Sequence, residues 1–452
     1  MTGVPLIIAF VVAIAAMILL ISKLKLHPFL AIMGISLLLA IVAGIPLTQI
    51  PGVIGAGFSG TFSSIGIVII LGAFIGSVLE KTGAALKLAD MVIKLVGEKN
   101  PGLAVELMGW VVSIPVFCDS GFVILNPIRK ALVKRTGKSS VMMTVCLSCG
   151  LYISHVFIPP TPGPIAAAQT LGVGENLLLV IGIGVLCSIL PLIAGFFYAK
   201  FIGKKIKSAD ELGDGTEVVK TYEELKAEYG KLPNGFNALA PLIIPIILMA
   251  LSSISAMSGW QGQIAELLTF LGTPIMALAV GAVLAIIQLL IAGKKSEFYN
   301  LTNESLKTVG PILFVTAAGG VLGKVIASSD MVNFIEANAT VLEAMGIFFP
   351  FLLAAILKSA QGSSTVAITT TAGIVAPLLP VLGFVTPIKI ALVVMAIGAG
   401  AMTVSHANDS YFWVVTNFGE MKPEEGYKSQ TLMTLVIGIA AMVEIFILNL
   451  IF

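Results

Sequence analysis

The chain has 452 residues, of which 57% are hydrophobic and only 11% are charged, with a net charge of +2. Soluble domains average about 25% charged residues, so this composition excludes a cytosolic enzyme, a disordered protein and a nucleic-acid-binding protein. The apolar runs are continuous and do not alternate, which favours a polytopic, all-α membrane protein over a barrel.

A helix needs about 20 apolar residues to cross a bilayer. The first suitable stretch begins at Val4, and no charged region or cleavage site marks it as a removable signal peptide. We predict ten crossings, at residues 4–22, 28–46, 63–80, 139–157, 175–200, 238–257, 274–292, 309–328, 387–405 and 431–451.

Two further apolar stretches, 102–128 and 346–382, are interrupted in the middle by polar residues. We interpret them as re-entrant hairpins within 102–135 and 346–385, each entering and leaving the membrane on one side. Residues 81–97 are expected to form an amphipathic helix on the cytoplasmic surface.

The positions of lysine and arginine orient the chain, because these residues concentrate in cytoplasmic loops. With both termini periplasmic, all but three of the 26 basic residues fall in cytoplasmic segments, which include the hydrophilic loop 203–237. The predicted outer segments 46–62, 258–273 and 329–345 contain no basic residue. The three exceptions lie within or at the edge of predicted spans: Lys324, Lys358 and Lys389.

The loop 203–237 divides the chain into halves, 1–202 and 238–452, with the same predicted order of spans and hairpin. Because five crossings is an odd number, the halves would be inverted relative to each other. Two short matches share one offset: Val78–Lys81 with Val321–Lys324, and Cys118–Phe122 with Gln361–Thr365. Two inverted repeats with broken helices are typical of secondary transporters with a central site.

The tip of the first predicted hairpin reads CDSGF at 118–122. A carboxylate within the membrane costs a few kcal/mol, so we expect Asp119 to carry a proton or orient a ligand. The alternative is a structural cap of the second hairpin arm. Backbone N–H groups at Ser120 and Gly121 could bind an anion.

The second tip, 358–365, offers more hydrogen-bond donors. Three hydroxyls follow Gly362 at the start of a new half-helix, where N–H groups and the helix dipole favour an anion. Lys358 adds a positive charge and could pair with Asp119 or Asp409. The alternative is that these hydroxyls only pack helices. The candidate residues at this tip are Lys358, Gly362, Ser363, Ser364 and Thr365.

Each half also contains a helix that breaks after the hairpin. Four prolines within 159–164 cannot continue a helix, and 405–413 reads SHANDSYFW. Freed carbonyl groups at these breaks must face protein or water rather than lipid. The two Ser-His pairs occupy corresponding places in the repeat. The candidate site residues are His155, Thr161, His406, Asn408 and Asp409.

Four polar clusters, CDSGF, SH…PPTPGP, KSAQGSSTVA and GAGAMTVSHANDSYFW, occur in this order along the chain. They resemble the patterns of the gluconate permease family of proton-coupled symporters. The resemblance implies uptake of gluconate or a related sugar acid with protons across the bacterial inner membrane. It also implies an elevator-type fold, similar to that of ion-coupled organic-anion transporters, with a mobile substrate domain beside a static dimer scaffold. Relatives take fructuronate, idonate, glycerate-like acids or D-serine, so the substrate stays open within this class.

We expect the substrate carboxylate to bind between the two tips, with Thr161, Asn408 and the two histidines contacting polyol hydroxyls. A proton on Asp119 or Asp409 would offset the buried negative charge. An alternative from another class is an intramembrane hydrolase that uses Ser120 or Ser363 with a histidine and an aspartate. A channel is a third option. No HExxH or Walker A sequence occurs, and we expect no catalytic residue, metal or cofactor.

Overall fold

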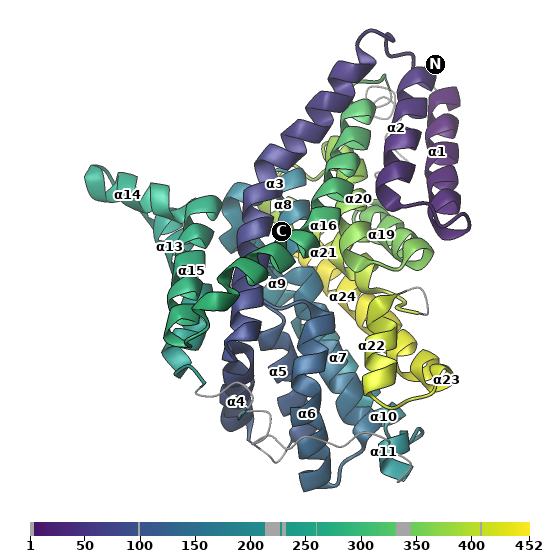
Figure 1. The fold of residues 1–452 in the computed structure, drawn as a ribbon. Coiled ribbons are helices and arrows are strands. Elements are labelled where there is room, and N and C mark those ends of the chain that lie inside the picture. Colours follow the sequence, from purple (N-terminus) through teal and green to yellow (C-terminus); the bar gives the residue numbers. More distant parts are fainter. Residues whose placement is uncertain are drawn as a thin grey trace.

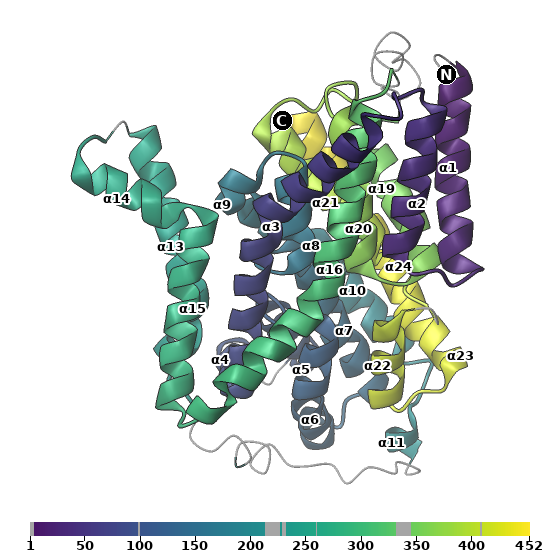
Figure 2. The same cartoon turned by 45° about the horizontal axis from the view of Figure 1, so that its top comes forward.

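The computed structural model describes residues 4–97, 100–212, 227, 232–258, 260–330, 345–406 and 409–452. Within these ranges the chain forms helices joined by short turns and contains no strand. The Asn408 of the predicted site lies outside the described residues. Figures 1 and 2 show the helices from two directions: most of them pack into one bundle, and a smaller group stands out at its side.

The first half follows the predicted order, with one correction. Residues 46–62 were expected as an outer loop, but a helix begins at Ile50 and continues to Lys81. Proline in its first turn fits a helix start, and glycine is well tolerated in membrane helices. The helices are α1 (Val4–Ser22), α2 (Pro28–Val42), α3 (Ile50–Lys81), α4 (Ala84–Val96), α5 (Pro101–Val112), α6 (Cys118–Thr136), α7 (Ser140–Phe157), α8 (Pro162–Thr170), α9 (Leu177–Leu186) and α10 (Ile189–Ile202).

The second half begins after the short helix α11 (Ala209–Leu212). The outer segment 258–273 contains a helix, α14, and the eighth predicted span lies within a longer helix, α16. The helices are α13 (Gly235–Met257), α14 (Gln263–Gly272), α15 (Pro274–Ile291), α16 (Phe298–Ala327), α19 (Phe348–Gln361), α20 (Ser364–Val375), α21 (Pro387–Met402), α22 (Ser410–Phe418), α23 (Pro423–Gly426) and α24 (Leu432–Ile451).

Fewer helices than the ten predicted crossings meet the length and composition needed to cross a membrane. Seven described stretches do so, or eight if the bent pair Gly66–Lys81 and Ala84–Val96 counts as one span. The difference arises because α2 and α21 have 15 and 16 residues, short of the about 20 that a full crossing needs. The described part of the chain is thus all-helical, with seven or eight clear apolar spans.

Both predicted helix breaks are present. The first lies between the end of α7 at Phe157 and the start of α8 at Pro162. The second separates the end of α21 at Met402 from the start of α22 at Ser410. The amphipathic segment 81–97 is also helical, as α4.

The two longest helices, α3 and α16, cross at the centre of the bundle (Figure 2). Their backbones nearly touch: a Cβ atom added to Gly57 would lie 2.7 Å from Val321 Cα. Small residues allow such approach in membrane helices. Helix α2 packs on α16, and α15 packs on α3. These four helices form a frame beside the hairpins.

The two helical hairpins are α5–α6 and α19–α20. Their first arms pack on the unbroken parts of the broken helices, α5 on α7 and α19 on α21. Their second arms meet the short helices that follow the breaks in the opposite half of the chain, since α6 contacts α22 and α20 contacts α8. In Figures 1 and 2, α5–α6 lies toward the end that carries α4 and α11, and α19–α20 lies nearer the start of α1.

The α5–α7 contact leads to a stability prediction. A Cβ atom at Gly150 would lie 1.9 Å from the backbone oxygen of Glu106, so Gly150→Ala must push the two helices apart. We expect a loss of about 1–3 kcal/mol in unfolding free energy, measured by thermal or denaturant unfolding in detergent. The matched control is Gly182→Ala in α9, where nothing lies within 4 Å of the added atom. Equal stability of the two variants would contradict the prediction.

Candidate functional site

The first hairpin turns at Ser113–Phe117, and α6 starts at Cys118. The Ser113 hydroxyl donates to the Val116 carbonyl at 3.0 Å, which closes the turn. Asp119 lies in the first turn of α6, and its Oδ1 atom accepts a hydrogen bond from Ser410 Oγ at 3.2 Å. The predicted tip carboxylate therefore faces the second helix break.

The second hairpin turns at Gly362, whose φ of 89° is in the left-handed region that glycine adopts most readily. Ser363 then caps α20, because its Oγ atom accepts a hydrogen bond from the Val366 amide at 3.3 Å. The hydroxyls of Ser364 and Thr365 belong to the first turn of α20 and are buried. This tip thus has the polar helix start expected from the sequence.

A buried ion pair joins the second hairpin to the second break. Lys358 Nζ lies 2.5 Å from Asp409 Oδ2, and both side chains are buried. Lys358 also donates to the carbonyl of Gly362 at the hairpin turn. Asp409 in turn caps α22 by accepting from the Tyr411 amide at 3.1 Å, and it accepts from Ser405 Oγ at 2.5 Å. One carboxylate therefore connects three segments.

The two tips and the second break enclose a cavity of 330 Å³. That volume is at the small end of the range for ligand sites, about 300–1,000 Å³. The predicted residues that line it are Asp119, His155, Gly362, Ser363, Ser364, Thr365 and Asp409. The lining also includes Phe117, Cys118, Tyr152, Ile312, Ser410 and Tyr411.

His155 is the residue of this lining with the clearest unused hydrogen-bonding capacity. It is 5% exposed, and its Nδ1 atom is buried with no hydrogen-bond partner in the described part of the chain. A ligand hydroxyl that reached this buried atom from the cavity would give it the hydrogen bond that it lacks. Its ring also contacts the Phe117 ring, with centroids 5.9 Å apart.

Other predicted residues lie away from this cavity. Thr161 is buried and donates to the Ile158 carbonyl at 2.7 Å. The Gly121 amide donates to the Phe117 carbonyl at 2.8 Å, so it is used within the hairpin. His406 is half-buried, and its carbonyl accepts from the Asp409 amide at 2.8 Å. Lys358 does not itself line the cavity, but it forms an ion pair with Asp409, which does.

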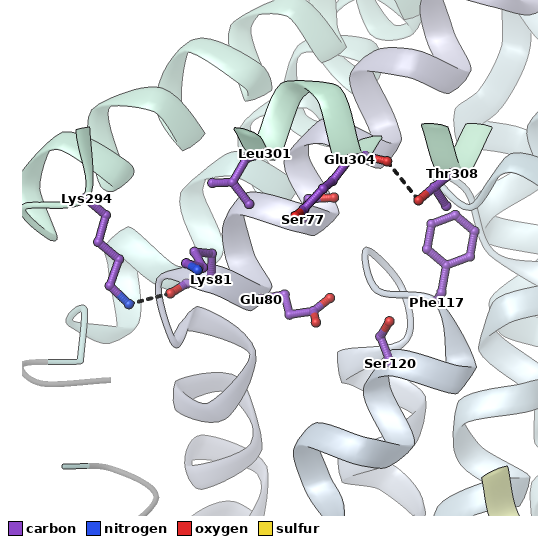
Figure 3. A pocket seen from close by; sticks show the side chains of 9 residues that line it. All are labelled: Ser77, Glu80, Lys81, Phe117, Ser120, Lys294, Leu301, Glu304 and Thr308. Atoms are coloured by element: carbon purple, nitrogen blue, oxygen red, sulfur yellow. Dashed lines mark hydrogen bonds between the residues drawn. The ribbon is translucent and has the colours of Figure 1, made fainter. Parts of the chain in front are cut away.

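Ser120 lines a second cavity, of 530 Å³, that we call the vestibule (Figure 3). The vestibule lies between the first hairpin tip and the crossing helices α3 and α16. Its other lining residues are Ser77, Glu80, Lys81, Phe117, Lys294, Leu301, Glu304 and Thr308. Figure 3 shows Glu80 and Ser120 pointing toward each other across it. Phe117 lines both cavities, so the vestibule and the site adjoin at this side chain.

The sequence reasoning missed several of these residues. Tyr152 precedes His155 by three positions on α7, a spacing that places both on one helix face. Ser410 and Tyr411 directly follow Asp409. Glu106 in α5 is 1% exposed; neither carboxylate oxygen has a conventional hydrogen-bond partner in the described residues, and the Cys149 thiol lies beside it. A carboxylate inside an apolar run was a signal that could have identified Glu106.

Comparison with known proteins identifies relatives of this chain. Two relatives are an uncharacterized permease of Haemophilus influenzae, 34% identical over 92% of this chain and 86% of its own length, and the inner membrane permease YgbN of Escherichia coli, 32% identical over 97% of both chains. A gluconate permease of Pseudomonas aeruginosa is 28% identical over 97% of this chain and 96% of its own.

Two solved structures share the fold. The YdaH transporter of Alcanivorax borkumensis matches with a TM-score of 0.68 and 13% identity, over 94% of this chain and 98% of its own. MtrF of Neisseria gonorrhoeae matches with a TM-score of 0.64 and 16% identity, over 96% of both chains. The model of the GntP family permeases matches residues 4–451. The chain therefore belongs to the GntP permease family.

Proposed function

We propose that this permease imports gluconate, or a closely related sugar acid, together with protons across the bacterial inner membrane. The observation that carries the proposal is the cavity between the two hairpin tips. It combines hydroxyl groups and a helix start, which suit a carboxylate and several hydroxyls, with two lining carboxylates, of which Asp409 is paired with Lys358. Gluconate and idonate transporters among the relatives support this class of substrate.

The charges around the cavity support proton coupling. Asp409 is paired with Lys358, so Asp119 is the carboxylate left facing the cavity without a cation among the described residues. A substrate carboxylate near Asp119 would add a second negative charge. Two such charges about 4 Å apart repel by about 4 kcal/mol at an effective dielectric constant of 20. A proton on Asp119 removes this repulsion, so proton and substrate would each favour binding of the other.

We also propose that the halves are inverted repeats and that the hairpins and broken helices move past a static, dimeric frame. Support comes from the matching packing of α5 on α7 and of α19 on α21, and from the tight α3–α16 crossing. In the predicted orientation, with periplasmic termini and a cytoplasmic loop 203–237, the vestibule would open toward the cytoplasm. The substrate would leave through it past Phe117.

The test is uptake of labelled gluconate into proteoliposomes that contain the purified protein. We expect accumulation when the outside is more acidic than the inside, and its loss when an uncoupler collapses the gradient. Unlabelled gluconate, idonate, fructuronate, glycerate and D-serine would then rank the substrates by competition. Uptake that ignores the proton gradient would overturn proton coupling. Failure of all five acids to compete would overturn the substrate class.

A further inference from the structure

We propose that a groove between α5, α7 and α10 binds the headgroup of an anionic phospholipid. The groove is a cavity of 620 Å³ at the end of the molecule that carries α11, and it shares no lining residue with the candidate site. Its most informative lining residues are Lys138, Lys200 and Lys204, together with Phe196, Phe197 and Phe201.

The groove concentrates positive charge. Lys138 follows the end of α6, Lys200 lies in the last turn of α10, and Lys204 lies one turn beyond it. No acidic side chain is among the described residues that line the cavity. Glu211, next to the groove, accepts a hydrogen bond from the Ser140 amide and contributes one negative charge against three positive ones. The charge of the groove therefore fits a phosphate group.

An apolar stripe leads away from these lysines along the outer face of α10. Ile189, Ile193, Phe197 and Phe201 recur every four residues and are 49%, 48%, 63% and 50% exposed. Side chains four positions apart lie on the same face of a helix. The stripe lies on the same helix as Lys200, whose Nζ atom is 4.9 Å from the centre of the Phe196 ring.

Only a lipid would use both parts of this surface. A free phosphate or a small organic anion would contact the lysines and leave the stripe uncovered. A phospholipid would place its phosphate among the lysines and an acyl chain along the stripe. Basic pockets between membrane helices on the cytoplasmic side are known binding places for anionic headgroups. The lysines also lie in segments that their charge assigns to the cytoplasmic side.

Lipid binding to the purified, delipidated protein tests the proposal, by native mass spectrometry and by the thermal shift that added lipid produces. The probes are phosphatidylglycerol, phosphatidylcholine and soluble glycerol phosphate. The test variant is Lys138→Gln/Lys200→Gln/Lys204→Gln. The control, Lys23→Gln/Lys25→Gln/Lys295→Gln, removes the same charge from exposed lysines elsewhere. Phe197→Ala tests the apolar stripe.

We expect phosphatidylglycerol, and not phosphatidylcholine, to bind and to raise the unfolding temperature. The groove variant should bind phosphatidylglycerol at least about tenfold more weakly, whereas the control should bind it as the parent does. Phe197→Ala should weaken the binding of phosphatidylglycerol without changing any binding of glycerol phosphate. Equal binding by the groove variant would overturn the proposal. Displacement of the lipid by glycerol phosphate at similar concentration would also overturn the proposal. A change in the oligomeric state of the groove variant would overturn it as well, if added lipid has no effect on that change.

Discussion

Replacing Lys358 by methionine is expected to destabilise the protein by about 3–5 kcal/mol and to abolish uptake, because it leaves Asp409 as an unpaired buried charge. The ammonium group also donates to the Gly362 carbonyl, so the variant loses this bond within the hairpin as well as the ion pair that joins the hairpin to the second break. Unfolding in detergent measures the first effect, and proteoliposome uptake measures the second.

Two further variants separate charge pairing from a general loss of lysine. Lys324→Met removes an exposed lysine of α16 and should leave both stability and uptake near the parent values. Lys358→Met/Asp409→Asn removes both charges and should recover much of the stability, since replacing a whole buried pair is often neutral. A single Lys358→Met variant as stable as the parent would show that Asp409 needs no partner.

Asp119→Asn is expected to keep substrate binding and to remove its dependence on pH. If proton and substrate favour each other's binding as proposed, gluconate affinity in the parent should fall by up to tenfold per pH unit once Asp119 is ionised. Asparagine mimics the protonated carboxyl, so the variant should bind gluconate equally well at low and high pH. It should also exchange labelled for unlabelled gluconate while failing to accumulate it against a gradient.

The matched control for Asp119 is Glu106→Gln, which changes another buried carboxyl that does not line the cavity. It should preserve the pH dependence of gluconate binding. Binding by isothermal titration across pH, together with exchange and accumulation assays, distinguishes the two residues. If Glu106→Gln flattened the pH profile of gluconate binding and Asp119→Asn did not, the result would contradict the assignment of the proton to Asp119.

The hairpin tips and helix breaks could be predicted because glycine, proline and hydroxyl residues interrupt otherwise apolar runs. The partner of Lys358 could not be predicted, because the sequence allowed an ion pair with either Asp119 or Asp409. Packing decides that choice, by bringing together two groups that are 51 residues apart in the chain. Sequence neighbours also separate in space: Asp119 lines the site, whereas Ser120, about 100° further around the helix, lines the vestibule.

The start of α3 shows a different reason why part of the fold could not be predicted from the sequence. Residues 52–60 contain four glycines, and this composition is typical of a loop. In the structure they belong to a helix, and Gly57 is the residue that allows α3 to approach α16. A close contact between helices far apart in sequence is a property of the packed bundle, so the local pattern could not reveal it.

The several bonds that Asp409 accepts have a consequence for selectivity. Lys358, Ser405 and the Tyr411 amide fix this carboxylate from three directions before any substrate arrives. A wall that is rigid in advance spares the ligand the entropic cost of ordering it. Discrimination among sugar acids would then depend on whether each hydroxyl of the incoming molecule matches a preorganised acceptor or donor. Stereoisomers of equal size and charge should therefore differ in affinity mainly through the few hydroxyls that they present with the opposite configuration.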